Sequence, residues 1–144
     1  GRERQVAFRY VMKKRGLILK DEWIIEGGFE LADGYKAFQR LMTNTDLPQI
    51  IITVNDRVAL GSFRAAAEMK ISIPDEISVA GYGFNETADT FNPSLAVINQ
   101  NPRTMGEEAV RLLVSEINGL KKRIKTLIPV EFIMNESVKI SNLI

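Results

Sequence analysis

The sequence predicts an α/β fold: a doubly wound, mostly parallel sheet with helices on both faces. Apolar runs of strand length and amphipathic stretches of helix length alternate strictly along the chain. The three isoleucines at 50–52 form a run without polar alternation, which is typical of a strand covered on both faces in a parallel sheet. Strands and helices that alternate in this way imply right-handed crossovers between parallel strands.

Helices are predicted where apolar residues recur with the period of an α-helix. The first is expected to end before Gly16, because glycine suits the position after a helix C-terminus. The expected helices are Glu3–Lys14 with Val6, Ala7, Tyr10 and Val11 on one face, Ala32–Thr43 with Tyr35, Phe38, Leu41 and Met42 inward, Asp56–Met69 with Ala59, Phe63, Ala66 and Ala67 inward, and Arg103–Asn118 with Met105, Ala109, Leu112, Leu113 and Ile117 on its apolar face.

Strands are predicted at the short apolar runs between these helices. A basic run, KKRIK at 121–125, separates the last helix from the last strand, and we interpret it as a solvated turn rather than a phosphate or partner site. The expected strands are Glu22–Glu26, Gln49–Val54, Ile77–Ala80, Leu95–Ile98 and a final one within 126–134, where Pro129 marks a bend or an edge.

The composition excludes several classes of chemistry. The chain has 144 residues, of which 45% are hydrophobic, so it can bury one core as a single domain. Its 19 basic and 18 acidic residues leave a net charge of +1, which provides no field to attract nucleic acid or an anionic membrane. The absence of cysteine and histidine from the sequence excludes disulfides, thiolate chemistry, zinc sites and serine–histidine triads. No apolar stretch approaches the length of a membrane span, and the sequence has no G-x-G-x-x-G motif and no P-loop for nucleotide chemistry. We therefore expect a soluble protein that is not an enzyme and holds no metal or cofactor.

Two polar side chains, Asn55 and Asp56, follow the isoleucine strand at the start of the next helix. Doubly wound sheets bind ligands outside the carboxyl ends of their strands, which is where this pair is expected. The alternative is helix capping, which both residue types perform well and which Asp56 could serve alone. A cap needs one such residue, so the other remains available for a ligand.

A resemblance to a known family extends over essentially the whole chain. It rests on four segments in this order: TVNDRVALG, IPDEISVAGYG, NPSLAVINQ and MGEEAVRLL. In order and spacing they resemble the effector-binding core of the LacI/GalR family of bacterial transcription regulators. The resemblance implies an incomplete lobe of the type I periplasmic-binding-protein-like fold. It assigns residues 1–100 to the C-terminal lobe, 101–130 to a segment normally in the N-terminal lobe, and 131–144 to a return to the C-terminal lobe. We expect a fragment without the family's helix-turn-helix head.

The resemblance also implies ligand-binding residues where this sequence matches the family's motifs. Arg4 matches an arginine that hydrogen-bonds effector hydroxyls or carboxylates, a task that suits a guanidinium with five fixed donors. Phe29 matches an aromatic residue that packs on a sugar or base, and Asn55 matches an asparagine whose amide both donates and accepts. We expect Asp56 and Phe84 to contact the ligand beside them. The alternatives are a solvated Arg4 and a Phe29 that belongs to the core.

One position departs from the family in a way that bears on the ligand. Gly83 stands where many relatives have an aspartate that binds two sugar hydroxyls, so that carboxylate is missing here. Glu86 or Asn85 could replace it from the next turn. Relatives that respond to sucrose or fructose also read AGYG, which is compatible with a furanose or disaccharide effector.

As a function, the resemblance implies the effector-sensing and dimerisation region of a cytoplasmic LacI-type transcription regulator that binds a sugar or related small molecule. Binding would shift the angle between two lobes, and DNA would be contacted only by a head outside this chain. A homodimer is expected through the helix after Asp56, unless Phe63 faces the sheet. The alternative is an extracytoplasmic sugar receptor of a transport system with the same fold. The expected interface residues are Arg57, Leu60, Phe63 and Arg64.

Overall fold

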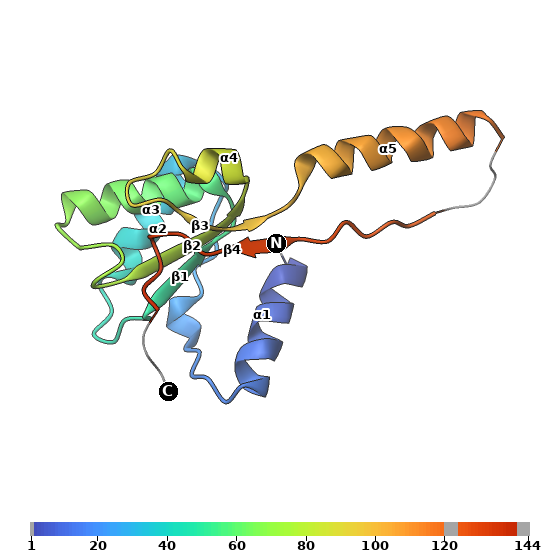
Figure 1. The fold of residues 1–144 in the computed structure, drawn as a ribbon. Helices are drawn as coiled ribbons and strands as arrows, with labels where there is room; N and C mark the ends of the chain where they lie inside the picture. Colours follow the sequence, from blue (N-terminus) through green and yellow to red (C-terminus); the bar gives the residue numbers. More distant parts are fainter. Residues whose placement is uncertain (1, 120–123, 141–144) are drawn as a thin grey trace.

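The computed structural model describes residues 2–119 and 124–140, and most of the basic run at 121–125 lies outside them. Its centre is a sheet with the strand order β1-β2-β3-β4. β1 (Ile50–Thr53), β2 (Ser78–Gly83) and β3 (Ala96–Asn99) are parallel, and β4 (Glu131–Ile133) pairs antiparallel with β3. Figure 1 shows α2, α3 and α4 on one face of this sheet and α1 on the other. The predicted α/β fold with a mostly parallel sheet is confirmed.

The helices agree with the predicted ones to within a few residues at each end. The short helix α4, directly after β2, was not predicted, because four residues are too few to show a hydrophobic period. Within the described residues the helices are α1 (Arg2–Lys14), α2 (Leu31–Leu41), α3 (Asp56–Glu68), α4 (Asn85–Ala88) and α5 (Pro102–Ile117).

The core lies on both sides of α3, which packs against the sheet and also against α2. One cluster joins α3 to β2 and β3, with Val79, Leu95 and Val97 fully buried. A second cluster joins α3 to α2 around Phe38. Because α3 is covered from two directions, more of its surface is buried than predicted. Ala67 was expected to face inward, but it is exposed. The buried residues of α3 are Ala59, Gly61, Ser62, Ala65 and Ala66.

The prediction of a strand at Glu22–Glu26 is wrong. Asp21–Trp23 form a 3-10 turn, η1, and the chain from residue 24 to 28 is extended but pairs with no described strand. The side chains of Trp23, Ile24 and Ile25 are half-buried, and the Trp23 indole donates to the Asp46 carbonyl at 2.9 Å. The apolar side chains of this segment are partly buried, but a strand also needs a neighbouring backbone with which to form a ladder.

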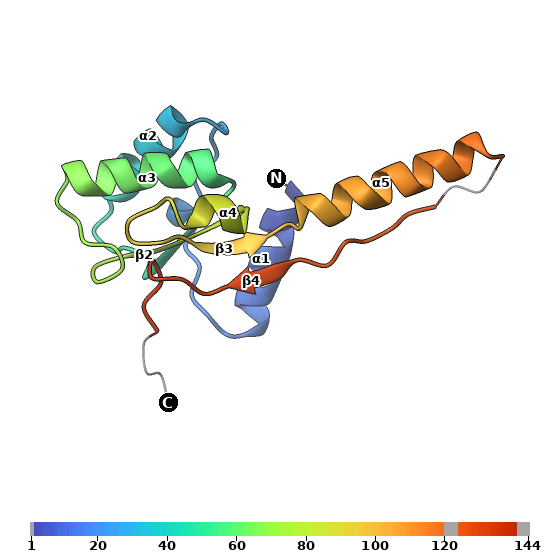
Figure 2. The same ribbon diagram turned by 45° about the horizontal axis from the view of Figure 1, so that its top comes forward.

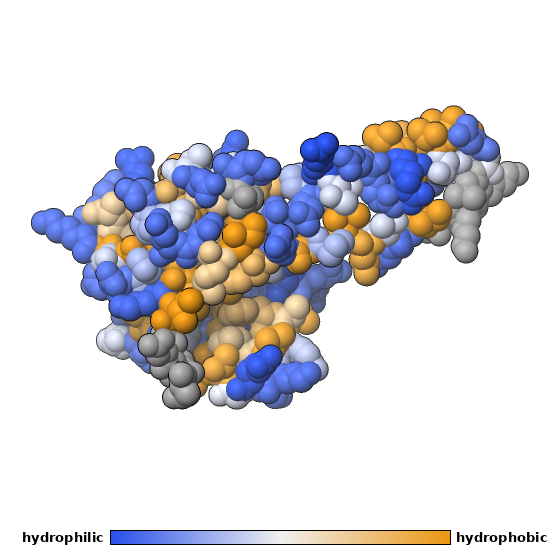
Figure 3. All heavy atoms as spheres, in the orientation of Figure 1, coloured by the Kyte–Doolittle hydropathy of each residue, from blue (hydrophilic) through white to orange (hydrophobic). Residues whose placement is uncertain are grey.

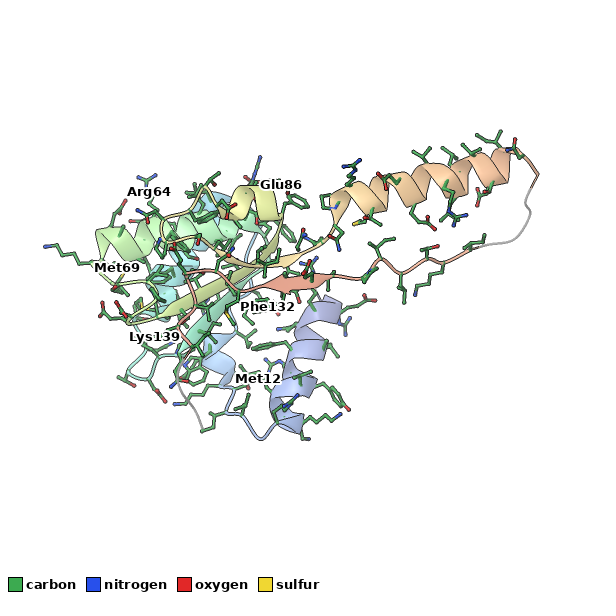
Figure 4. All side chains as sticks on the ribbon, in the orientation of Figure 1. Met12, Arg64, Met69, Glu86, Phe132 and Lys139 are labelled. Carbon is green, nitrogen blue, oxygen red and sulfur yellow. The ribbon has the colours of Figure 1, made fainter. Side chains whose placement is uncertain are left out.

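The predicted apolar face of α1 is exposed rather than buried. Val6 and Tyr10 are 61% and 64% exposed, whereas Phe8 and Met12 are half-buried with Arg4 on the side toward the sheet. Figure 4 shows Met12 on this helix, which lies beneath the strands. Contacts of Arg4 with the sheet fix the rotation of the helix about its axis, and they turn the expected apolar face outward.

Helix α5 extends away from the sheet, and the chain from residue 124 to 130 runs back beside it (Figure 1, Figure 2). Met105, Ala109 and Leu112 face Ile124 and Ile128 across a shallow groove. No residue of α5 is buried within the described structure, and apolar side chains are exposed along its far end (Figure 3). Within residues 2–119 and 124–140, no helix is both long enough and apolar enough to cross a membrane.

The end of α3 offers a stability prediction. Lys70 has φ +57°, and the Lys70 and Ile71 amides donate to the Ala67 and Ala66 carbonyls in a Schellman-type C-terminus. A side chain in this left-handed region is strained, so Lys70→Gly should raise the free energy of unfolding by about 0.5 to 1 kcal/mol. Urea denaturation measures the change. The same replacement at Lys36, inside α2, is the control and should destabilise by about 1 kcal/mol.

The chain after β4 returns across the start of β2 and β3. Ser137 is completely buried there, and its hydroxyl donates to the Val79 carbonyl at 2.6 Å and accepts from the Ala96 amide at 2.8 Å. The neighbouring Glu136 carboxylate accepts from the Ser94 amide and hydroxyl, which lowers the pKa of Glu136. These bonds attach the C-terminal segment to the middle of the sheet.

Candidate functional site

The carboxyl ends of the three parallel strands lie side by side and form one edge of the sheet. The strand register pairs Thr53 with Gly81 and Gly83 with Asn99, so β1, β2 and β3 end within a residue or two of one another. The first residues of α3 and α4 follow at this edge. Open α/β sheets bind ligands in this position, so we take the edge as the candidate site.

Arg4 reaches this edge from α1. Its Nη1 donates to the Val54 carbonyl and its Nη2 donates to the Gln100 side-chain oxygen, both at 3.1 Å. Its guanidinium carbon lies 4.0 Å from the centroid of the Tyr82 ring. The arginine is half-buried, so it is not the solvated residue of the alternative interpretation. Two of its five N–H groups are used within the described residues, and the others remain for an acceptor.

Asn55 caps helix α3, and its side chain also joins two loops. Its Oδ1 accepts from the Val58 amide at 2.8 Å, and its Nδ2 donates to the Phe29 carbonyl at 2.9 Å. The expectation that Asp56 could be the cap is wrong, because Asn55 has the extended backbone of an N-cap residue and Asp56 is the first helical residue. The Asn55 amide keeps a second hydrogen and a second oxygen lone pair for other partners.

Two of the predicted ligand-binding residues, Phe29 and Phe84, are exposed aromatic residues. Phe29 is 59% exposed, which contradicts the alternative that it is an ordinary core residue. Its carbonyl accepts from the Asn55 side chain, so its backbone lies at the same edge. Phe84 is 38% exposed and precedes α4 as its N-cap residue. Exposed aromatic rings beside polar groups are suited to packing on the apolar face of a ligand.

Asp56 fills the space beside Gly83. A Cβ atom at Gly83 would overlap the Asp56 carboxylate, so the glycine is explained by this close approach and not by its backbone conformation. The Asp56 Oδ2 accepts from the Thr87 hydroxyl at 2.7 Å, while its Oδ1 is buried without a hydrogen-bond donor among the described residues. Glu86, proposed as a replacement carboxylate, is exposed on α4 (Figure 4). The carboxylate closest to position 83 is therefore that of Asp56.

The expected interface residues lie on α3, but not all on one face. Leu60 is 48% exposed, and Arg57 and Arg64 are exposed with ion pairs to Glu30 and Glu68. Phe63 is half-buried, and its ring packs edge-on against Phe91 with centroids 5.1 Å apart. Phe63 therefore contributes mainly to the core, as the alternative interpretation of this residue held.

Sequence reasoning missed two residues at the edge, Tyr82 and Gln100. Both were inside segments that carried the resemblance, but their pairing with Arg4 joins positions 78 and 96 residues apart, which no local pattern reveals. In the part of the chain that the structure describes, no group of three or more acidic side chains could hold a metal ion.

The fold is an α/β lobe with polar side chains at the carboxyl edge of its sheet. Residues 1–138 match the model of the periplasmic binding protein-like domain, and the chain belongs to that family. Within the family it is similar to regulators of the LacI type.

Two curated relatives are similar in sequence, and one solved structure is similar in fold. The chain is 33% identical over 138 residues to the HTH-type transcriptional repressor PurR of Histophilus somni, covering 94% of this chain and 41% of the relative. It is 34% identical over 139 residues to PurR of Mannheimia succiniciproducens, covering 96% and 42%. The crystal structure of a putative transcriptional regulator LacI from Bacillus cereus subsp. cytotoxis matches with a TM-score of 0.89 at 22% identity, over 96% of this chain and 49% of that one. The chain thus spans less than half the length of these proteins.

Proposed function

We propose that this chain is the effector-sensing and dimerisation region of a LacI-type transcription regulator that binds a sugar or related small molecule. The observation that carries the proposal is the meeting of Arg4, Asn55 and Phe29 at the carboxyl edge of the sheet. Together they offer N–H donors, an amide that donates and accepts, and an exposed ring. A polyhydroxylated ligand needs these three kinds of contact.

The regulatory function is favoured over a transport receptor by the matched relatives, which are named as transcriptional repressors. The whole protein would then act in the cytoplasm, and a helix-turn-helix head outside this chain would contact DNA. Ligand binding would change the angle between two lobes and so the spacing of two such heads. The relatives are repressors rather than enzymes, which supports a protein that binds its ligand without converting it.

We assign residues 101–130 to a second lobe, and residues 131–144 to a return to the first. Helix α5 leaves the sheet directly after β3, and the chain comes back to the sheet only at β4. The Asn101 side chain donates to the Pro129 carbonyl at 2.8 Å, so the outgoing and returning segments are joined where they leave the sheet. A ligand enclosed between two lobes loses most of its exposed surface, which an isolated edge does not provide.

A homodimer would form through the outer face of α3. Leu60 supplies an apolar centre, and Arg57 and Arg64 supply a polar rim. A two-fold axis brings the same patch of both copies together, so each copy contributes its own exposed Leu60 to the interface.

The binding site is tested by two substitutions in the full-length protein. Arg4→Ala removes the guanidinium, and Asn55→Ser keeps an oxygen that can cap α3 while removing the amide donor. Each should weaken binding about 10- to 100-fold, because hydrogen bonds to a charged or buried polar partner are lost. Isothermal titration calorimetry with D-ribose, D-fructose and sucrose measures the affinities.

Arg9→Ala is the matched control for Arg4→Ala. Arg9 lies on the same helix but forms an exposed ion pair with Asp21 at 2.8 Å, and Asp21 is not one of the residues at the edge. Its loss should leave the affinity unchanged, since exposed ion pairs contribute little. Equal affinities for all four proteins would show that the ligand binds elsewhere.

A further inference from the structure

The ring of Tyr82 lies against the Arg4 guanidinium at the end of β2. Tyr82 stands between Gly81 and Gly83, whose missing side chains would point to the α3 side of the sheet. Because side chains alternate along a strand, the Tyr82 ring projects to the opposite side, where α1 lies. The guanidinium carbon is 4.0 Å from the ring centroid, which is the distance of a close cation–π contact.

Arg4 needs such support, because its position on the helix is unfavourable. It lies in the first turn of α1, where a positive charge opposes the helix dipole. An arginine side chain also carries about 2 kcal/mol of rotamer entropy, which it loses when it is held in one orientation. No residue of α1 is buried within the described structure, so packing of the helix alone does not hold this side chain.

Three contacts hold the guanidinium from three directions. The Val54 carbonyl and the Gln100 side-chain oxygen each accept one N–H group, and each comes from a different strand end. These bonds fix two points of the guanidinium but leave it free to tilt about the line between them. The Tyr82 ring opposes that tilt, because it lies against the guanidinium with its centroid 4.0 Å from the guanidinium carbon.

We propose that Tyr82 is a positioning residue for ligand binding: its ring sets the plane of the Arg4 guanidinium, so that the remaining N–H groups are oriented for a pair of ligand oxygens. This inference rests on the proposed function of Arg4. It assigns no ligand contact to Tyr82 itself. Vicinal hydroxyls and carboxylates present two oxygens in the geometry that a guanidinium edge matches.

A double-mutant cycle in the full-length protein tests the proposal, with D-ribose, D-fructose and sucrose as calorimetric probes. Tyr82→Leu should weaken binding of the sugar that binds best by about 3- to 30-fold, the loss expected for a partly desolvated cation–π contact. Tyr82→Phe retains the ring and should bind within about twofold of the original protein. In an Arg4→Gln background, Tyr82→Leu should cause no further loss, because the residue acts only through Arg4.

The alternative is that Tyr82 merely attaches α1 to the sheet or contacts the sugar directly. In either case Tyr82→Leu would weaken binding by the same factor in the original protein and in the Arg4→Gln variant. This result would overturn the proposal. Binding that is lost in Arg4→Ala but unaffected by Tyr82→Leu would overturn the inference alone. Failure of the original protein to bind any of the three sugars would overturn the proposed sugar-binding function, and the inference with it.

Discussion

Replacing Ser137 with alanine is expected to lower the free energy of unfolding by about 2 to 4 kcal/mol. The serine hydroxyl is completely buried and bonds two backbone groups at once, the Val79 carbonyl and the Ala96 amide. Alanine leaves both groups buried without a partner, and each unsatisfied group costs about 1 to 3 kcal/mol. Urea denaturation followed by circular dichroism measures the loss.

Ser62→Ala is the matched control for this prediction. Ser62 is also buried, at 3% exposure, and its hydroxyl donates to the Val58 carbonyl at 3.0 Å. That carbonyl is inside α3 and retains its helical bond when the hydroxyl is removed, so the loss should stay below about 1 kcal/mol. Equal losses for the two variants would show that the reduced volume, and not the two bonds of Ser137, determines stability.

The sequence was sufficient to predict helices and strands that show a hydrophobic pattern within their own residues. Phe38 and Leu41 of α2 are buried as its period predicts, and β1 lies at the isoleucine run. The expectation that this strand is covered on both faces is wrong, because β1 is at the edge of the sheet and Ile50 and Ile52 are 41% and 43% exposed. The strand expected at Glu22–Glu26 shows where this reasoning stops, because pairing depends on a neighbour that the segment itself does not encode. The rotation of α1 could not be predicted either, since the contacts of Arg4 with the sheet outweigh the apolar pattern of Val6 and Tyr10.

The candidate site was predicted in part. The position of Asn55 and Asp56 after a strand placed both at the carboxyl edge, and the observed contacts agree. Which of the two caps the helix could not be decided, since both residue types are good caps and the choice depends on where the helix begins. The approach of Asp56 to Gly83 joins two strand ends in space, so it became visible only in the folded chain.

The position of Phe29 relative to Asn55 depends on how closely α2 approaches α3. Gly34 and Gly61 lie in the contact between these helices, and a Cβ atom at either would overlap backbone of the other helix. For Gly61 the obstructing atoms are the Leu31 carbonyl and the Tyr35 amide nitrogen, the latter 2.7 Å away. Backbone atoms inside a helix cannot move aside as a flexible side chain does, so a methyl group here must separate the two helices.

Gly61→Ala is therefore expected to lower the free energy of unfolding by about 1 to 3 kcal/mol, although alanine is the better helix former by about 1 kcal/mol. Separation of the helices would also pull Phe29 away from Asn55, whose Nδ2 donates to the Phe29 carbonyl at 2.9 Å, so ligand affinity should fall with stability. Gly106→Ala in α5 is the matched control, because no atom lies within 4 Å of the added Cβ, and it should stabilise or leave stability unchanged. Urea denaturation of both variants provides the comparison. A stabilised Gly61→Ala protein would show that α2 and α3 do not pack through these glycines, and that the bond between Asn55 and Phe29 does not depend on their close approach.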